Sequence, residues 1–195
     1  MKYAKILKLK ARVFFTASDV AQAFNIKPES AWVLCSRYVK EGAFIRLKRN
    51  TYTLEQNWKS WVNEDFFKVS NFLQVPSYIS FMTALSFYEI TTQAQRGFFE
   101  SASLKRTRKF EIEGTTFNFY KLKKQYYFDF NRQESVFIAS KEKAFVDSVY
   151  LYSFGKYKID FSSIDFNKLD KARIRKILQI YPLKTKAIME NLCKI

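Results

Sequence analysis

Hydroxyl, guanidinium and ammonium groups recur at helical spacing between residues 27 and 40. A guanidinium such as that of Arg37 can donate two parallel hydrogen bonds to O6 and N7 of guanine, whereas the short hydroxyls of Ser30 and Ser36 suit phosphate oxygens. The positions expected to point outward from a helix through this segment are Lys27, Ser30, Val33, Ser36, Arg37 and Lys40. We interpret this row as a candidate surface for nucleic acid, with Arg37 as the best candidate for contact with a base.

A helix that positions this row is predicted from Pro28 to about residue 41. Proline is favoured at the first helical position, where its missing N–H costs nothing, and Gly42 is expected to end the helix. The opposite, apolar side consists of Ala31, Leu34, Cys35 and Tyr38. Residues at this spacing face a core. We also expect Trp32 to pack.

The segments on either side of this helix complete a recognisable arrangement. Residues 14–24 are predicted to form a first helix with a Ser or Thr cap, and residues 25–27 form a tight turn. After Gly42, residues 43–47 and 51–54 are strand-like and flank a polar turn at 48–50. The basic side chains of this hairpin are Arg46, Lys48 and Arg49. The pattern predicts a winged helix-turn-helix whose basic wing contacts phosphates or the minor groove.

The charge distribution favours a polyanionic partner. The chain of 195 residues has 34 Lys and Arg against 18 Asp and Glu, a formal net charge of +16, and a pI of about 9.8. Residues 1–54 contain eleven of the basic residues and three of the acidic ones. About half of the net charge is therefore concentrated in the segment predicted to bind DNA.

The second half of the sequence predicts an α+β domain. We expect an aromatic helix over 58–73, a helix over 76–90, and strands at 110–113, 115–121, 126–130 and 136–139. Ser140 is expected to cap a helix over 141–151, and helices are expected over 167–180 and from Leu183 onward. The predicted fold is α+β, with a winged helix-turn-helix domain and connecting helix at 1–75 and a mixed C-terminal domain at 76–195.

This second half is also basic. Its two concentrations of charge are Lys105, Arg106, Arg108 and Lys109, and then Lys171, Arg173, Arg175 and Lys176. The apolar stripe of the helix over 167–180 leaves the second group on the outside. These residues can extend a DNA footprint, contact a structured RNA, contact an acidic partner, or serve as a solvated surface. DNA is the interpretation that we favour.

Composition argues against several chemistries. The chain has no histidine, so His-based acid–base catalysis and most zinc sites are excluded. Its four glycines are isolated, which excludes a Gly-rich phosphate loop. Cys35 and Cys193 are far apart in the sequence and fit reduced, idle thiols. We expect no catalytic residues, no metal and no cofactor, no membrane segment, and a cytoplasmic protein whose N-terminus lacks a signal peptide.

Two alternatives stay open beside a DNA-binding regulator. One is an enzyme that uses Ser140, Lys143 or Asp147, although the spacing of Lys143 and Asp147 is explained more simply by an i,i+4 salt bridge. The other is a ligand-responsive winged-helix regulator. Its expected pocket is formed by Phe117, Phe119, Tyr126 and Phe128.

Three segments together resemble the AbiEi family of antitoxins. They are the basic wing at residues 45–52, the segment 78–91, and the segment 139–147 with its Lys-Ala-x-x-Asp pattern. The resemblance spans nearly the whole chain, and its motifs are mostly structural. One departure is Asn50, where the family commonly has glycine in the wing turn. Asparagine tolerates the left-handed conformation, so the hairpin is retained.

The resemblance implies a transcriptional autorepressor with antitoxin activity, from a type IV toxin–antitoxin or abortive-infection operon used in phage defence. Its winged helix would bind inverted repeats of double-stranded DNA in its own promoter. Its C-terminal domain would counter a nucleotidyltransferase-like toxin encoded beside it, without the need for a stable protein complex. The implied protein is not an enzyme.

Overall fold

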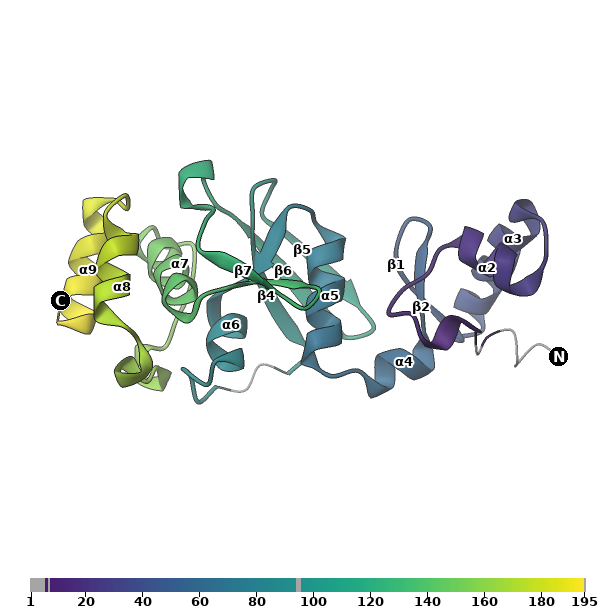
Figure 1. Ribbon diagram of the computed structural model, residues 1–195, viewed down its shortest axis with the longest axis horizontal. Coiled ribbons are helices and arrows are strands. Elements are labelled where there is room, and N and C mark those ends of the chain that lie inside the picture. The colour runs from purple at the N-terminus through teal and green to yellow at the C-terminus, as the bar shows by residue number, and fades with distance from the viewer. Residues whose placement is uncertain (1–5, 7, 94–95, 195) are drawn as a thin grey trace. The chain divides into compact units, whose positions relative to one another are not determined.

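The computed structural model describes residues 6, 8–93 and 96–194, and residues 1–5, which bear on the expected absence of a signal peptide, lie outside this part of the chain. The fold is mixed α and β (Figure 1). The chain divides into two compact units. Unit 1 is Met1–Leu73 with Ile112–Gly114, and unit 2 is Gln74–Glu111 with Thr115–Ile195.

Unit 1 begins with two helices joined by a tight turn. Helix α2 spans Ala17–Phe24, and Thr16 and Asp19 form a reciprocal capping box at its start. The helix ends at Asn25, whose φ of 52° is left-handed, a conformation that asparagine tolerates. Helix α3 spans Pro28–Lys40 and has its proline in the first turn, as the sequence predicts.

A two-stranded hairpin follows α3. Strand β1 spans Phe44–Lys48 and strand β2 spans Thr51–Leu54, paired antiparallel. Asn50 has a φ of 56°, so the left-handed turn expected at this position is present. The Asn50 side chain also accepts a 3.0 Å hydrogen bond from the amide of Ala17, which ties the hairpin turn to the first residue of α2.

A single aromatic and aliphatic core holds these elements together. Its buried members include residues of α2, α3 and both strands, among them Val20, Ala31, Cys35, Phe44 and Tyr52. Because Phe15 pairs with Tyr52 in an isolated β-bridge, the segment before α2 is also fixed to the hairpin. Two further helices, α4 (Glu55–Ser60) and α5 (Asn63–Leu73), complete the unit.

Unit 2 contains a six-stranded sheet in the order β5-β6-β4-β3-β8-β7. The strands are β3 (Ser77–Ile79), β4 (Phe98–Ser103), β5 (Arg108–Ile112), β6 (Thr115–Lys121), β7 (Phe130–Gln133) and β8 (Val136–Ala139). Strand β4 pairs parallel with β6 and antiparallel with β3, and β3 pairs parallel with β8. The sheet is therefore mixed.

The prediction of one helix over 76–90 is wrong. The segment begins as strand β3, between β4 and β8, and only Phe81–Phe87 forms a helix, α6. Tyr78 and Ile79 are both fully buried, so this short strand is apolar on both faces and lacks the alternation that distinguishes a strand from a buried helix. Strand β4 was not predicted from the sequence either.

Other boundaries also differ from the prediction. The helix expected over 14–24 begins only at Ala17, and the helix expected over 58–73 is two helices, α4 and α5, interrupted at residues 61–62. Residues 126–130 were expected to form a strand, but Lys124–Tyr126 is a 3-10 turn and β7 begins at Phe130, after Asp129 adopts a left-handed φ of 55°. The helix expected over 167–180 is the shorter α8, Lys171–Leu178. It begins there because the Asp170 side chain accepts hydrogen bonds from the amides of Ala172 and Arg173.

Helix α7, Lys141–Ser153, is the central helix of unit 2 (Figure 1). It contacts α6, α8 and α9 (Leu183–Cys193), and nearly all of its residues are buried. Ser140 caps its N-terminus by accepting from the Lys143 amide at 3.2 Å, as predicted. Among the described residues, no helix combines the length and hydrophobicity needed to cross a membrane.

Candidate functional site

The outward row of α3 lies on the surface of unit 1. Lys27, Ser30, Val33, Ser36, Arg37 and Lys40 are all exposed. On the opposite side, Ala31, Cys35 and Tyr38 are buried in the core and Leu34 is half-buried. The helical period therefore separates the two faces as the sequence predicts.

Two apolar side chains are also exposed on this helix. Val33 is 71% exposed and Trp32 is 42% exposed, although Trp32 was expected to pack. The expectation for Trp32 is wrong because its neighbour Ala31 occupies the core-facing position of this turn. Large exposed apolar groups beside basic ones can contact thymine methyl groups or sugars.

Arg37 makes only weak interactions within the protein. Its Nε lies 3.7 Å from a carboxylate oxygen of Glu41, one turn along α3, and both side chains are about half exposed. Its guanidinium carbon lies 5.6 Å from the centre of the Tyr38 ring. Because exposed i,i+4 ion pairs contribute little, Arg37 can exchange this partner for another acceptor.

The basic residues of the hairpin fall into two kinds. Arg46 and Arg49 are exposed. Lys48 is half-buried, its ammonium donates a 2.9 Å hydrogen bond to the carbonyl of Phe72, and the same group lies 3.4 Å from the centre of the Phe72 ring. Lys48 therefore stabilises unit 1 through α5, and we leave it out of the candidate interface.

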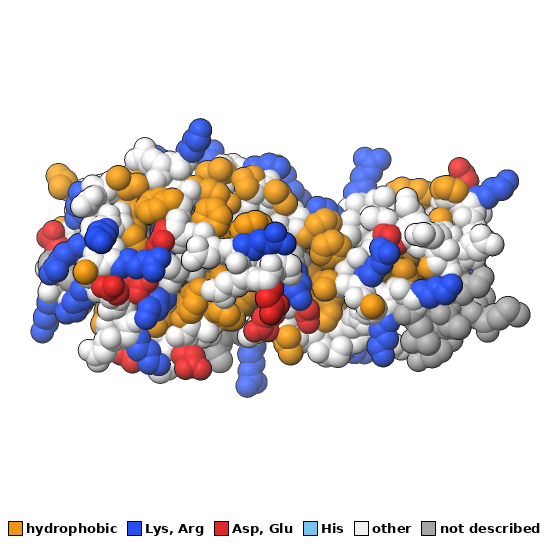
Figure 2. All heavy atoms as spheres, viewed as in Figure 1, with side chains coloured by type: hydrophobic (Ala, Val, Ile, Leu, Met, Phe, Trp, Pro, Cys, Tyr) orange, Lys and Arg blue, Asp and Glu red, His pale blue; other side chains and the backbone are white. Residues whose placement is uncertain are grey.

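The predicted basic residues of unit 2 are all on its surface. Lys105, Arg106, Arg108, Lys109, Lys171, Arg173, Arg175 and Lys176 are exposed. Figure 2 shows Lys and Arg side chains over much of the visible face, with small groups of acidic side chains between them. Arg173 was expected to be one of the outward basic residues, but its guanidinium is paired with two acids. It bonds Asp129 at 2.7 Å and lies 3.8 Å from buried Glu142.

Lys143 and Asp147 form the expected i,i+4 salt bridge, and both side chains are fully buried. Asp147 also accepts hydrogen bonds from the hydroxyls of Tyr78 and Ser80, each at 2.9 Å, and from that of Tyr181 at 3.3 Å. Lys143 donates to the Tyr78 hydroxyl at 3.0 Å. The pair therefore joins α7 to β3 and to the segment after α8.

Burial dominates the electrostatics of this pair. Burial lowers the pKa of Lys143 and raises the pKa of Asp147, and each partner's charge acts in the opposite direction. Neither side chain reaches solvent, and the Ser140 hydroxyl donates to Asp129 rather than to the side chain of Asp147. A substrate therefore has no access to Lys143 or Asp147, and the Ser140 hydroxyl is not hydrogen-bonded to either of these side chains.

The pocket expected from the ligand-responsive alternative is occupied by core side chains. Phe117 and Phe119 are fully buried, with rings packed against Phe99 and Phe110. Tyr126 stacks on Tyr181 with ring centres 4.4 Å apart. This prediction is wrong because alternate residues of β6 point into the core of unit 2, not into a cavity.

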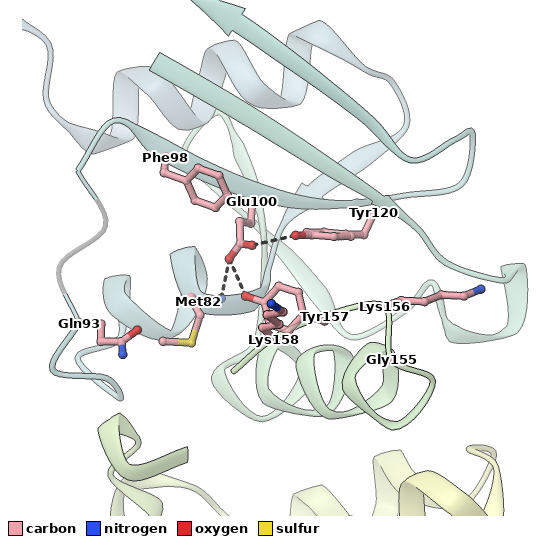
Figure 3. A pocket seen from close by; sticks show the side chains of 9 residues that line it. All are labelled: Met82, Gln93, Phe98, Glu100, Tyr120, Gly155, Lys156, Tyr157 and Lys158. Atoms are coloured by element: carbon pink, nitrogen blue, oxygen red, sulfur yellow. Dashed lines mark hydrogen bonds between the residues drawn. The ribbon is translucent and has the colours of Figure 1, made fainter. Parts of the chain in front are cut away.

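A cavity of about 460 Å³ opens instead on the other face of β6, beside β4 (Figure 3). Its central group is the carboxylate of Glu100, which is 2% exposed. Glu100 accepts hydrogen bonds from the hydroxyls of Tyr157 at 2.7 Å and Tyr120 at 3.3 Å, and from the Met82 amide at 3.2 Å. The remaining lining residues are Gln93, Phe98, Gly155, Lys156 and Lys158.

Burial raises the pKa of Glu100 to about 7, and the hydrogen bonds from Tyr157, Met82 and Tyr120 oppose this rise. Burial and the nearby Glu100 charge also raise the pKa of Tyr157 and Tyr120 above the ordinary range. Both tyrosines are therefore hydrogen-bond donors at neutral pH. The arrangement can switch Glu100 between an acceptor-only carboxylate and a neutral acid near pH 7.

A second cavity of about 710 Å³ lies beside the first. It is lined by Thr107, Tyr120, Lys121, Leu122, Lys123, Tyr150, Leu151, Phe154, Lys156 and Pro182. Tyr120 and Lys156 line both cavities. Neither cavity was predicted from the sequence. The one signal that could have indicated this region is Glu100, a lone acid within the otherwise uncharged run of residues 97–104.

Comparison with known proteins gives the fold alone. No protein-family model and no curated protein sequence matches this chain. Among solved structures, the chain is similar to the crystal structure of the Rv2827c protein from Mycobacterium tuberculosis, with a TM-score of 0.64 and 9% sequence identity, over 98% of this chain and 75% of that one. At this identity the likeness supports a shared architecture.

Proposed function

We propose that unit 1 is a winged helix-turn-helix that binds double-stranded DNA, with α3 as the recognition helix and the β1–β2 hairpin as the wing. The observation that carries the proposal is the two-sided character of α3. Its core face is buried, and its outward row includes Arg37, whose ion pair with Glu41 is exposed to solvent. A recognition helix needs such a polar and basic face toward base edges and phosphates.

The hairpin supports this assignment. Arg46 and Arg49 are exposed on strand β1 and at the turn, and Asn50 fixes that turn to α2 through Ala17. A rigid, basic hairpin next to a recognition helix can contact phosphates or enter the minor groove. The candidate interface of unit 1 is Lys27, Ser30, Val33, Ser36, Arg37, Lys40, Arg46 and Arg49.

We propose further that the DNA is the promoter of the protein's own operon and that the protein represses it. This step rests on the resemblance to the AbiEi antitoxins, as does antitoxin activity against a nucleotidyltransferase-like toxin encoded nearby. In unit 2, the segments that carry the resemblance include β3 and α7, which are joined by Tyr78, Lys143 and Asp147. These residues support a structural role for the family motifs.

Fluorescence anisotropy of the purified protein on its upstream DNA, with scrambled duplex as competitor, tests DNA binding. We expect a preference for the native duplex, steep salt dependence, and weaker binding by Arg37→Ala. Lys59→Ala is a matched control, because Lys59 is also exposed and paired with a glutamate at i,i+4 spacing. Equal binding to both duplexes, or an equal effect of the two variants, would contradict the proposal.

Antitoxin activity needs a separate test. Co-expression with the neighbouring toxin is expected to restore growth, and the Arg37→Ala variant is expected to lose repression while it keeps this rescue. A ligand-responsive regulator without an antitoxin role is the second candidate, favoured by the two cavities of unit 2. Absence of rescue, together with a change in DNA affinity on ligand addition, would support it instead.

A further inference from the structure

We call the two neighbouring cavities of unit 2 together the tyrosine groove. It is defined by the lining residues of the 460 Å³ and 710 Å³ cavities, which share Tyr120 and Lys156. Both volumes are within the ~300–1,000 Å³ typical of small-molecule sites. All of its lining residues belong to unit 2, so the groove is distinct from α3 and the hairpin.

The walls of the larger cavity are aromatic. Tyr150 and Phe154 lie one turn apart at the end of α7, with ring centres 5.4 Å apart in an edge-to-face arrangement. Phe154 is 46% exposed, so much of this side chain is accessible to solvent. Tyr120 of β6 forms the wall between the two cavities, and its hydroxyl is held by Asn118 and Glu100.

The rim of the groove is basic. Lys121, Lys123 and Lys156 line the larger cavity, Lys158 lines the smaller one, and all four are exposed. Lys184 adds a fifth ammonium, 5.7 Å from the centre of the Phe154 ring. Among the described lining residues, Glu100 is the one carboxylate, and it is buried beneath its tyrosine partners.

The exposed ring of Phe154 and the half-buried ring of Tyr120, beside several ammonium groups, are complementary to a flat aromatic group linked to an anion. We propose that the tyrosine groove binds an unpaired nucleotide unit, with its base against Phe154 and Tyr120 and its phosphate at the rim lysines. Stacking on aromatic side chains combined with a basic track is how proteins hold unpaired bases without sequence preference. A paired base cannot use these walls, because its faces are covered by its neighbours in the stack.

The nucleotide unit can be free or part of a single strand, and the test separates these sources. The probe is fluorescein-labelled hexaadenylate, whose anisotropy is measured with the full-length protein at low salt. The competitors are unlabelled hexaadenylate, AMP, inorganic phosphate and a stable duplex. Displacement by AMP supports a free-nucleotide site, whereas displacement by hexaadenylate but not by AMP supports a single-strand site.

Substitutions at residues of the tyrosine groove test whether the probe binds there. Phe154→Ala is expected to weaken probe binding about tenfold, and Phe154→Trp, which keeps a ring, is expected to retain it. Lys123→Glu is expected to weaken binding strongly, and Lys194→Glu, an exposed charge reversal outside the groove, is the matched control. Since Phe154, Lys123 and Lys194 are all surface residues, each variant is expected to fold.

Several results would overturn the proposal. One is that the protein does not bind the probe. Another is that inorganic phosphate displaces the probe as effectively as AMP does, and a third is that Phe154→Ala binds the probe with wild-type affinity. Displacement by duplex together with loss of binding in Arg37→Ala would instead assign the probe to α3. Because Arg37→Ala is expected to leave probe binding unchanged, failure of the groove and failure of the DNA-binding surface give different results.

Discussion

Tyr157 donates a 2.7 Å hydrogen bond to the carboxylate of Glu100, 57 residues earlier in the chain. This bond fixes the segment after α7 to strand β4 of the sheet. Both Tyr157 and Glu100 line the smaller cavity (Figure 3). The burial that makes the bond strong also disfavours the ionised acid. Glu100 is therefore both a structural contact and a titrating group within the tyrosine groove.

The pH dependence of stability is expected to reveal this group. The pKa of Glu100 is about 7 in the folded chain against 4.5 ordinarily, so its contribution is fully present below pH 4.5 and is lost as pH rises through 7. The shift corresponds to about 3 kcal/mol of unfolding free energy. Urea unfolding of wild type and Glu100→Gln at pH 5 and pH 8 measures it.

The comparison between the two proteins isolates Glu100 from other titrating groups. The wild type is expected to lose about 3 kcal/mol more than Glu100→Gln between these two pH values, because glutamine does not ionise. If the difference between the two free energies were the same at both pH values, Glu100 would have an ordinary pKa and the proposed electrostatics of the cavity would be wrong.

Removal of the Tyr157 hydroxyl tests the contact from its other side. Tyr157→Phe leaves a buried carboxylate without its shortest hydrogen bond, which is expected to cost about 1–3 kcal/mol of stability. Tyr152→Phe makes the same chemical change at a tyrosine that is 40% exposed, and it is expected to be neutral. Thermal or urea unfolding at pH 8 compares the two, and equal effects would contradict the structural role of the bond.

The faces of α3 were predictable from sequence because local rules determine them. Pro28 and Gly42 bracket the helix, and a period of 3.6 residues separates buried Cys35 from exposed Arg37. No contact with a distant segment is needed to derive that separation. The same holds for Ser140, whose role as a cap depends on the next three residues.

The tyrosine groove could not be predicted because distant pairings create it. Glu100 and Tyr120 approach each other only because β4 pairs parallel with β6. Tyr157 reaches Glu100 from the segment that follows α7, far along the chain. The prediction for the segment that forms β3 failed for a related reason. With both faces buried, Tyr78 and Ile79 give no alternating pattern, and the sheet rather than local preference makes this segment extended.

The buried pair on α7 is expected to be strongly coupled. Lys143→Met or Asp147→Asn alone leaves an uncompensated group in the core, at a cost of about 3–5 kcal/mol. The double variant is expected to lose less than the sum of the two. Urea unfolding of the four proteins gives the coupling energy. The control is the surface pair of exposed Lys59 and half-buried Glu55, also at i,i+4 spacing, which is expected to show almost no coupling. Additive losses at Lys143 and Asp147 would show that the pair does not act as a unit.

Lys48 and Arg49 are adjacent basic residues of the hairpin, and we expect Lys48 to affect stability and Arg49 to affect DNA binding. Lys48→Met removes the ammonium that bonds the Phe72 carbonyl and covers its ring, so stability falls by about 1–2 kcal/mol while affinity for DNA is retained. Arg49→Ala removes an exposed charge, so stability is retained while affinity falls for native and scrambled duplex alike and the salt slope decreases by about 1. Unfolding curves and anisotropy titrations of both variants give the four values. If Lys48→Met lowered the salt slope as Arg49→Ala does, the Lys48 ammonium would be contacting phosphate and its bond to Phe72 would be secondary.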